Sequence, residues 1–340
     1  MFPQLINKVE VPELKNILVN EQITILSPIE SARLAATAHK MVRQNLQAQI
    51  RPGMTLLEIA EIVENGTKTV LGQGYNKGIG FPTGLSLNSC AAHDSPNPKS
   101  HPVVLAANDI LKVDFGTHVN GYIIDSAFTV CFNPDYDNLL LAARESVYEC
   151  LKLAGPDAPI KDIADKAEEV IRSYELTIDG RTVPIRPVTN LNGHSINQYK
   201  IHGGKYVPII KNSGNKSRML PGEFFAIETF ATTGNGYVNE KGDCSHYMIS
   251  NPNVHSKLEG GKTLMKYIQN TFSTLPFCKR YIDPTEIKSA DTYINYLTKI
   301  GGIDDYPPLY DSPGSLVSQF EHTLYVNESG IEVLSRGDDY

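Results

Sequence analysis

The chain has 340 residues, of which 41% are hydrophobic and 20% are charged, values close to those of average globular proteins. Its 31 basic and 38 acidic residues give a net charge of −7, which argues against a broad basic surface for nucleic acid. No apolar run reaches the ~18 residues of a transmembrane helix. The N-terminus lacks the basic and apolar regions of a secretory signal, so we expect no membrane association.

The cysteines indicate a reducing compartment. Their number is odd, they are widely spread, and none forms a C-x-x-C pair. Neither a disulfide framework nor a thiolate metal site is therefore expected, and we place the protein in the cytoplasm. The five residues concerned are Cys90, Cys131, Cys150, Cys244 and Cys278.

Two helix starts are visible near the N-terminus, after short mixed runs over residues 1–26 that predict an arm. Ser27 can cap a helix, Pro28 suits its first turn, and Glu30 completes a capping box. The pattern predicts a helix to about residue 50. Residues 55–58 repeat the capping pattern and predict a second helix to about residue 71.

The rest of the chain mixes strands and helices irregularly, which favours an α+β fold over a doubly wound parallel sheet. No close internal repeat is visible. We predict loops and short strands over 72–110, strands at 110–117 and 121–131, helices at 138–153 and 160–174, short β runs over 175–250, helices at 262–272 and 284–300, a strand at 317–326, and a polar tail at 335–340.

A hairpin that carries two acids is the most informative segment. Asn120-Gly121 separates two apolar alternations, and this dipeptide favours a two-residue turn. In that register Asp114 pairs with Ala127. Asp125 pairs with Gly116, two positions along the same strand, so the two aspartates become diagonal neighbours on one face. A turn longer or shorter by one residue would put them on opposite faces.

Two carboxylates held together in a sheet repel each other and lose water, which a bound cation would relieve. Taken alone, the hairpin is more readily explained by two solvated aspartates on an outward face. Three later segments favour a metal site over solvated aspartates. Glu228 and Glu321 each lie on an apolar β run, and His194 lies in a turn of small residues.

Together these residues would supply four carboxylates and one imidazole, enough charge to balance two divalent ions. Such an oxygen-rich set suits Mn, Fe, Co or Zn, and the absence of thiolates argues against a structural zinc site. Carboxylates can bridge two ions ~3.5–4 Å apart and so acidify a water between them.

At these residues the sequence resembles the type 2 methionine aminopeptidases, over nearly the whole chain from about Ser27. Each matching segment is weak alone, whereas all of them in order are highly specific. The segments are 79–83, 91–93, the Asp114/Asp125 hairpin, 192–196, 201–202, 226–230, 306–309, 319–323 and 335–340.

The resemblance implies a pita-bread α+β fold, in which two related halves surround one dimetal site. Type 2 members also carry a helical insert before the last metal ligand. We therefore expect an N-terminal arm at 1–26 and a catalytic domain at 27–340, with the insert at about 250–306.

The resemblance also implies roles for individual residues. Asp114 would chelate one metal, Asp125 and Glu321 would bridge both, and His194 and Glu228 would complete the second site. Glu228 would also shuttle the proton of the attacking water.

Substrate contacts follow from the same likeness. His202 would steady the carbonyl oxygen, and His93 would contact the substrate near the scissile amide and be alkylated by fumagillin-type inhibitors. The residues similar to those lining the methionine side-chain pocket are Phe81, Ile201, His246 and Tyr306.

The implied activity is removal of the initiator methionine from nascent proteins whose second residue is small, by a monomeric enzyme with two divalent ions (Co, Mn, Fe or Zn). The ribosome is a further candidate partner, but residues 1–26 lack the charged blocks of the N-terminal extension common in eukaryotic members.

Two other interpretations use the same fold. Proliferation-associated proteins resemble this family but have lost metal ligands, and they bind nucleic acid or ribosomes. The intact ligand positions and the negative charge favour the enzyme. Prolidase and aminopeptidase P relatives usually carry a large extra N-terminal domain, which we do not expect here.

Overall fold

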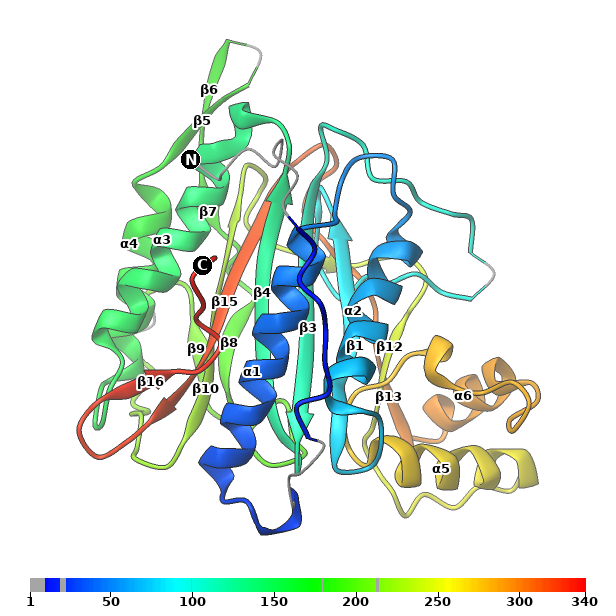
Figure 1. The fold of residues 1–340 in the computed structure, drawn as a ribbon. Helices are drawn as coiled ribbons and strands as arrows, with labels where there is room; N and C mark the ends of the chain where they lie inside the picture. The colour runs from blue at the N-terminus through cyan, green and yellow to red at the C-terminus, as the bar shows by residue number, and fades with distance from the viewer. Residues whose placement is uncertain (1–9, 19–22, 99, 179, 212–213) are drawn as a thin grey trace.

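The computed structural model describes residues 10–18, 23–98, 100–178, 180–211 and 214–340 (Figure 1). Its helices are α1 (Pro28–Gln47), α2 (Leu56–Leu71), α3 (Asp137–Leu153), α4 (Ile160–Arg172), α5 (Glu259–Phe272) and α6 (Ala290–Lys299). Its strands are β1 (Lys77–Leu87), β2 (Cys90–Ala92), β3 (Ile110–Val119), β4 (Tyr122–Cys131), β5 (Glu175–Ile178), β6 (Arg181–Pro184), β7 (Arg186–Pro187), β8 (Asn192–Ile196), β9 (Tyr206–Pro208), β10 (Phe224–Thr232), β11 (Asn239–Glu240), β12 (His246–Ile249), β13 (Ile303–Tyr306), β14 (Leu309–Tyr310), β15 (Val317–Val326) and β16 (Ile331–Val333).

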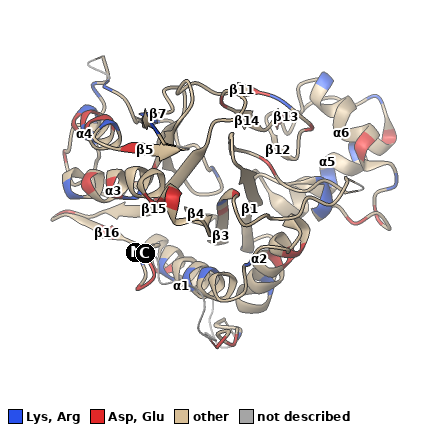
Figure 2. Ribbon diagram, turned by 90° about the horizontal axis from the view of Figure 1, so that it is seen from above, with Lys and Arg blue, Asp and Glu red and all other residues tan. Residues whose placement is uncertain are grey.

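Two similar halves make up the centre of the molecule. In the first, helices α1 and α2 cover the antiparallel sheet β1-β3-β4. In the second, α3 and α4 cover a sheet of order β16-β15-β10-β8-β9. Seen from above, the helix pairs lie on the outside and the strands lie between them (Figure 2). This mixed arrangement confirms the α+β prediction.

The halves meet where β4 of one sheet lies beside β15 of the other (Figure 1). Hydroxyl side chains bridge these strands by bonding to main-chain groups of the opposite strand. The bridges run from Thr129 to the carbonyl of Gln319 (2.7 Å), from Ser126 to that of Glu321 (2.7 Å) and from Thr323 to that of Asp125 (2.6 Å).

The helix caps and the hairpin turn predicted for the first half are confirmed. Ser27 and Glu30 form a capping box at α1, and Thr55 and Glu58 form one at α2. Asn120-Gly121 makes the two-residue turn of the β3–β4 hairpin, with φ of 52° and 77° as a type I′ turn requires.

Strand β1 corrects the expectation of loops and short strands over 72–110. It runs for 11 residues although it contains Pro82 and several glycines. Irregularities in its pairing with β3 lie between Ile79 and Phe81 and between Phe81 and Gly84. These bulges let a long strand accommodate residues that, by local pattern, would end one.

Helices α5 and α6 pack around a hydrophobic core of their own, separate from the main one. The helix predicted over 284–300 begins only at Ala290. Before it, the Asp283 carboxylate accepts hydrogen bonds from the Thr285 amide and hydroxyl, both at 2.7 Å, which forms a turn. Ser289 is left-handed, with φ of 58°. The insert bounds and the division at residue 27 remain predictions.

The polar segment 335–340 has no regular secondary structure and is held at its two ends. Ser335 is fully buried and Tyr340 is 7% exposed, whereas Arg336 and Asp338 between them are exposed. Of the expected arm, the described residues lie against α1 and α2, where the Ile17 amide donates to the Val70 carbonyl at 3.0 Å. All five cysteines are free. Among the described helices, none combines the length and apolar character needed to cross a bilayer.

Candidate active site

One cavity between the two halves and the insert is lined by every residue singled out from the sequence. It gathers side chains from both central sheets and from the β12–β13 hairpin. The predicted residues on its wall are Phe81, His93, Asp114, Asp125, His194, Ile201, His202, Glu228, His246, Tyr306 and Glu321.

The strand registers explain how the five proposed ligands converge. Asp114 pairs with Ala127 and Asp125 pairs with Gly116, so the two aspartates are diagonal neighbours as predicted. In the second sheet Glu228 of β10 lies directly opposite Glu321 of β15. Strand β8 lies on the side of β10 opposite to β15. Its residue His194 pairs with Ala226 of β10, two positions before Glu228.

Three of these ligands already form a compact set. One ligand atom each from Asp125, His194 and Glu321 lies within 4.8 Å of the others, and all three residues are buried. The Nε2 atom of His194 lies 3.5 Å from Asp125 Oδ2. A His194 ring protonated on Nδ1 would donate to the Ser195 carbonyl at 3.3 Å, leaving the Nε2 lone pair free to bind a cation.

The buried carboxylates of the five proposed ligands would be stabilised by a bound positive charge. Burial raises the pKa of Asp114 to about 6, and burial together with the Asp114 carboxylate raises the pKa of Asp125 well above its usual range. Burial lowers the pKa of His194 to about 3, so its ring is neutral. Asp114 Oδ1 and Glu321 Oε2 are buried without a hydrogen-bond partner. A divalent cation would satisfy both oxygens, so these residues fit the metal.

Gln319 is a site residue that sequence reasoning missed as such. It lies on β15 two residues before Glu321, and its amide nitrogen donates to Asp114 Oδ2 at 3.0 Å and to Glu228 Oε2 at 3.3 Å. The neutral Gln319 amide thus contacts one carboxylate from each of the two central sheets. The two-residue spacing from Glu321, which puts both side chains on one face, was the available signal.

The apolar part of the cavity is formed by the β12–β13 hairpin and the bulged strand β1. His246 of β12 pairs with Tyr306 of β13. Phe81 lies opposite Gly116, where any Cβ would come within 2.3 Å of the Phe81 ring. Glycine at this position therefore makes room for the aromatic wall. Further lining residues, which had no sequence signal, are Leu191, Phe230, Met248 and Pro276.

The two remaining histidines flank the ligands. His93 has a left-handed backbone with φ of 64°, a strained conformation for a non-glycine residue that clusters at functional sites. The Ser245 hydroxyl donates to its carbonyl at 3.2 Å, and its ring lies 5.8 Å from that of His246. The His202 ring meets His194 edge-on at 4.6 Å. Burial lowers the pKa of His93 to about 4, so its ring is uncharged at neutral pH.

Comparison with known proteins defines the class. The family model of metallopeptidase family M24 matches residues 30–328. A methionine aminopeptidase from Thermotoga maritima superposes with a TM-score of 0.62 at 19% identity, covering 93% of this chain and 99% of that one. A thermophilic Arx1 gives 0.79 at 17% identity, covering 92% and 91%. These likenesses confirm the pita-bread fold, and a metallopeptidase family implies use of divalent metal.

Relatives at higher identity narrow the assignment. Methionine aminopeptidase 2 of Clavispora lusitaniae is 49% identical over 91% of this chain and 71% of its own length. That of Encephalitozoon hellem is 47% identical over 94% and 90%. The chain therefore belongs to metallopeptidase family M24 and, within it, to the type 2 methionine aminopeptidases.

Proposed function

We propose that this protein removes the initiator methionine from nascent chains whose second residue is small, using two divalent ions (Co, Mn, Fe or Zn). The observation that carries the proposal is the shared cavity. Four carboxylates and a neutral imidazole lie beside an apolar wall that suits an unbranched thioether side chain. That the relatives are named methionine aminopeptidases supports the methionine specificity.

The five ligands would divide the ions between them. Asp114 would hold one ion, His194 and Glu228 would complete the site of the other, and Asp125 and Glu321 would serve both. When bound, the metals act as Lewis acids and lower the pKa of water at the site. The strand register supports a shared site for Glu228 and Glu321, because these two residues lie directly opposite each other on β10 and β15.

The protein's own groups move the proton and hold the substrate. A Glu228 carboxylate oxygen takes the proton of the attacking water and delivers it to the leaving amine, a transfer that typically contributes about 10²–10⁴-fold. A ring N–H of His202 donates to the carbonyl oxygen as negative charge develops there, which is typically worth about 10²–10³-fold. His93 contacts the substrate near the scissile amide.

The methionine side chain would lie against Phe81, Ile201, His246 and Tyr306. Burial lowers the pKa of His246 to about 3, so this wall is uncharged at neutral pH and suits an apolar guest. The neutral His93 ring lies edge-on to Tyr306 at 6.0 Å, at the junction of this wall and the ligands.

A peptide series tests this function. Purified protein with added Mn²⁺ or Co²⁺ should release free methionine from Met-Ala-Ser and leave acetyl-Met-Ala-Ser and Leu-Ala-Ser largely intact. Met-Lys-Ser should be cut much more slowly. Equal cleavage of the first peptide bond in all four peptides, or no methionine release from Met-Ala-Ser with either metal, would contradict the proposal.

The second candidate is a metal-free binding protein on the same fold. The Arx1 likeness has a high TM-score but concerns the fold alone. The five ligand side chains on the cavity wall and the partnerless carboxylate oxygens favour the enzyme.

Other parts of the proposal concern partners. We expect a cytoplasmic monomer whose substrates are nascent N-termini, with the ribosome as a candidate partner. Fumagillin-type epoxides should alkylate a His93 ring nitrogen, detectable as a mass increase of one inhibitor on the peptide that contains His93. A His93→Asn variant should show no such adduct.

A further inference from the structure

The main chain of Glu321 points away from its partner strand. Its N–H donates to the Tyr340 hydroxyl at 3.4 Å, and its carbonyl accepts from Ser126 at 2.7 Å. Neither group is thus used in the ladder with β10. Glu228 and Glu321 therefore form a non-hydrogen-bonded pair, the type in which opposed side chains come closest.

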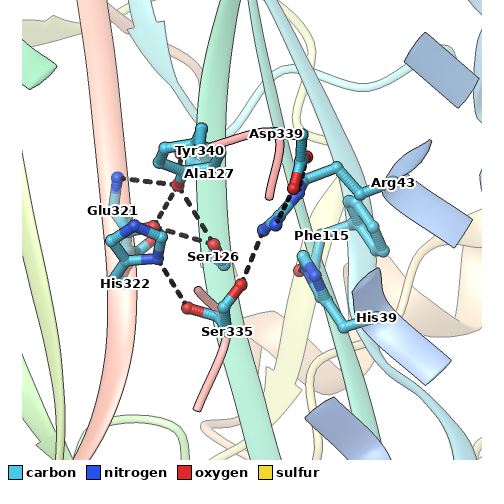
Figure 3. A network of polar contacts seen from close by, with 10 residues as sticks. All are labelled: His39, Arg43, Phe115, Ser126, Ala127, Glu321, His322, Ser335, Asp339 and Tyr340. Carbon is cyan, nitrogen blue, oxygen red and sulfur yellow. Dashed lines mark hydrogen bonds and ion pairs between the residues drawn. The ribbon is translucent and has the colours of Figure 1, made fainter. Parts of the chain in front are cut away.

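The Tyr340 hydroxyl occupies the junction between the two halves (Figure 3). It lies within hydrogen-bonding distance of the carbonyls of Ala127 on β4 and Glu321 on β15. It also lies 3.2 Å from the Ser126 hydroxyl. One phenol oxygen therefore contacts both strands at the level where β4 presents Asp125 and β15 presents Glu321.

Several groups fix the Tyr340 ring in this place. It stacks on His322 with centroids 4.4 Å apart, and the Arg43 guanidinium lies 4.7 Å above the ring. Arg43, on α1, is fully buried and pairs with Asp339 at 2.6 Å. It also donates to the Ser335 carbonyl at 2.9 Å. The segment that carries Tyr340 is thus anchored to α1 of the first half, while its hydroxyl contacts both β4 of the first half and β15 of the second.

We propose that Tyr340 is a positioning residue for the metal centre: its hydroxyl sets the spacing of β4 and β15 and thereby the gap between Asp125 and Glu321. This inference rests on the proposed metal site. Without the hydroxyl, the Glu321 N–H would lose its partner and the contact from Ala127 to Glu321 through the phenol would be broken. Groups that orient ligands in this way typically change metal affinity by about 10–100-fold.

The test is Tyr340→Phe, which removes the oxygen and keeps the ring. Metal-stripped protein is titrated with Mn²⁺ and Co²⁺ by calorimetry, and the Co²⁺ absorption spectrum reports ligand geometry. We expect about tenfold weaker metal binding, an altered Co²⁺ spectrum, and a lower kcat on Met-Ala-Ser with KM within about twofold of wild type. Affinity within twofold of wild type would overturn the proposal.

Ser318→Ala is the matched control. Ser318 is a fully buried β15 residue whose hydroxyl donates to the Leu139 carbonyl at 2.6 Å, on the side of α3 rather than at the metal site. This variant should lose stability but keep metal affinity and spectrum. An equal loss of affinity in both variants would reduce Tyr340 to a general packing role and contradict the inference.

Ser126→Ala decides the matter if Tyr340→Phe does not fold, because it removes a neighbouring hydroxyl from the same junction. We expect a several-fold loss of metal affinity, and an unchanged affinity would overturn the proposal. The calorimetric readout is independent of peptidase activity. Wild type that binds metal but cuts no peptide would defeat the proposed function and leave this inference testable.

Discussion

The two halves of the molecule supply the proposed metal ligands in different ways. The first half presents Asp114 and Asp125 from a single hairpin, whose two-residue turn fixes which face they share. The second half collects His194, Glu228 and Glu321 from three strands that are distant in sequence. A local turn thus specifies one part of the site, whereas the other part depends on the register of a whole sheet.

This difference indicates which contacts the geometry of the proposed metal site depends on. A hairpin holds its acids in register by short-range geometry, so its failure requires a changed turn. The second sheet must instead be aligned with the first by side-chain contacts between β4 and β15, which belong to different sheets, and by Gln319. These contacts are the hydroxyl bridges of Thr129, Ser126 and Thr323 and the bond from Gln319 to Asp114. Breaking a contact between halves should therefore impair the metal centre without unfolding either half.

The largest effect is expected for Asp125→Asn, because this residue links the two halves at the metals. The amide cannot supply the second anionic oxygen that a bridge needs, so both ions should bind weakly. Loss of Lewis-acid stabilisation worth several kcal/mol corresponds to about a 10³-fold drop in kcat/KM. Elemental analysis checks the cause, and two full equivalents of metal in this variant would refute the bridging role.

A smaller loss without metal release is expected for His202→Ala. His202 donates to the substrate rather than to the ions in our account, so turnover on Met-Ala-Ser should fall by about 10²–10³-fold. Metal content should stay at the wild-type level. If the variant were inactive only because it had lost metal, His202 would act as a metal ligand of the second half and not as a donor to the substrate.

The segment that carries α5 and α6 is also joined to the first half by a buried polar contact, as the two halves are joined to each other. Arg280 of the insert pairs with Glu64 on α2 at 2.5 Å and donates to the Ser95 hydroxyl at 3.0 Å, near His93. Arg280→Met leaves a buried carboxylate unpaired and should cost about 3 kcal/mol in the free energy of unfolding, measured in urea. Lys262→Met, which breaks an exposed pair with Glu259, should change it by less than about 1 kcal/mol. Equal losses would mean that the buried pair does not anchor the insert.

The smallest effect concerns a histidine that packs beneath the first sheet. Burial, and then the charge of Arg43, lower the pKa of His39 to about 3. The unfolded chain therefore binds more protons between that pKa and ~6.5, so stability from this group is complete above pH 6.5 and falls as pH drops.

The limit for this one group is about 1.4 kcal/mol per pH unit. His39→Gln, which can keep the hydrogen bond to the Phe115 carbonyl, should flatten the pH dependence of unfolding between pH 5 and 6 by about 1 kcal/mol per unit. An unchanged slope would show that His39 does not titrate on unfolding.

Sequence reasoning was most successful where the structure is local. The capping boxes at Ser27 and Thr55 and the hairpin at Asn120-Gly121 are each set by a few consecutive residues, and all three were predicted. His194, Glu228 and Glu321 could be singled out from their local sequence as candidate ligands. Their convergence with the aspartates depended on the family resemblance, because no spacing along the chain specifies which strands become neighbours.

The missed features share a non-local origin. Strand β1 tolerates Pro82 because its bulges fit β3, a partner that lies more than twenty positions away. The burial of Ser335 and Tyr340 is not visible in the polar sequence of residues 335–340, because their partners lie on distant elements. Arg43 on α1 donates to the Ser335 carbonyl, and the Tyr340 hydroxyl contacts Ser126 on β4. Gln319 gains its role only when Asp114 and Glu228 come together. Such polar groups become interpretable once their tertiary partners are known.

A metal titration of chelator-treated protein tests the central claim most directly, with methionine release from Met-Ala-Ser followed at each addition. We predict no activity without metal, and binding that is complete at two equivalents in wild type. Full activity after verified metal removal, or no metal binding by the wild-type protein, would contradict a dimetal centre built from Asp114, Asp125, His194, Glu228 and Glu321.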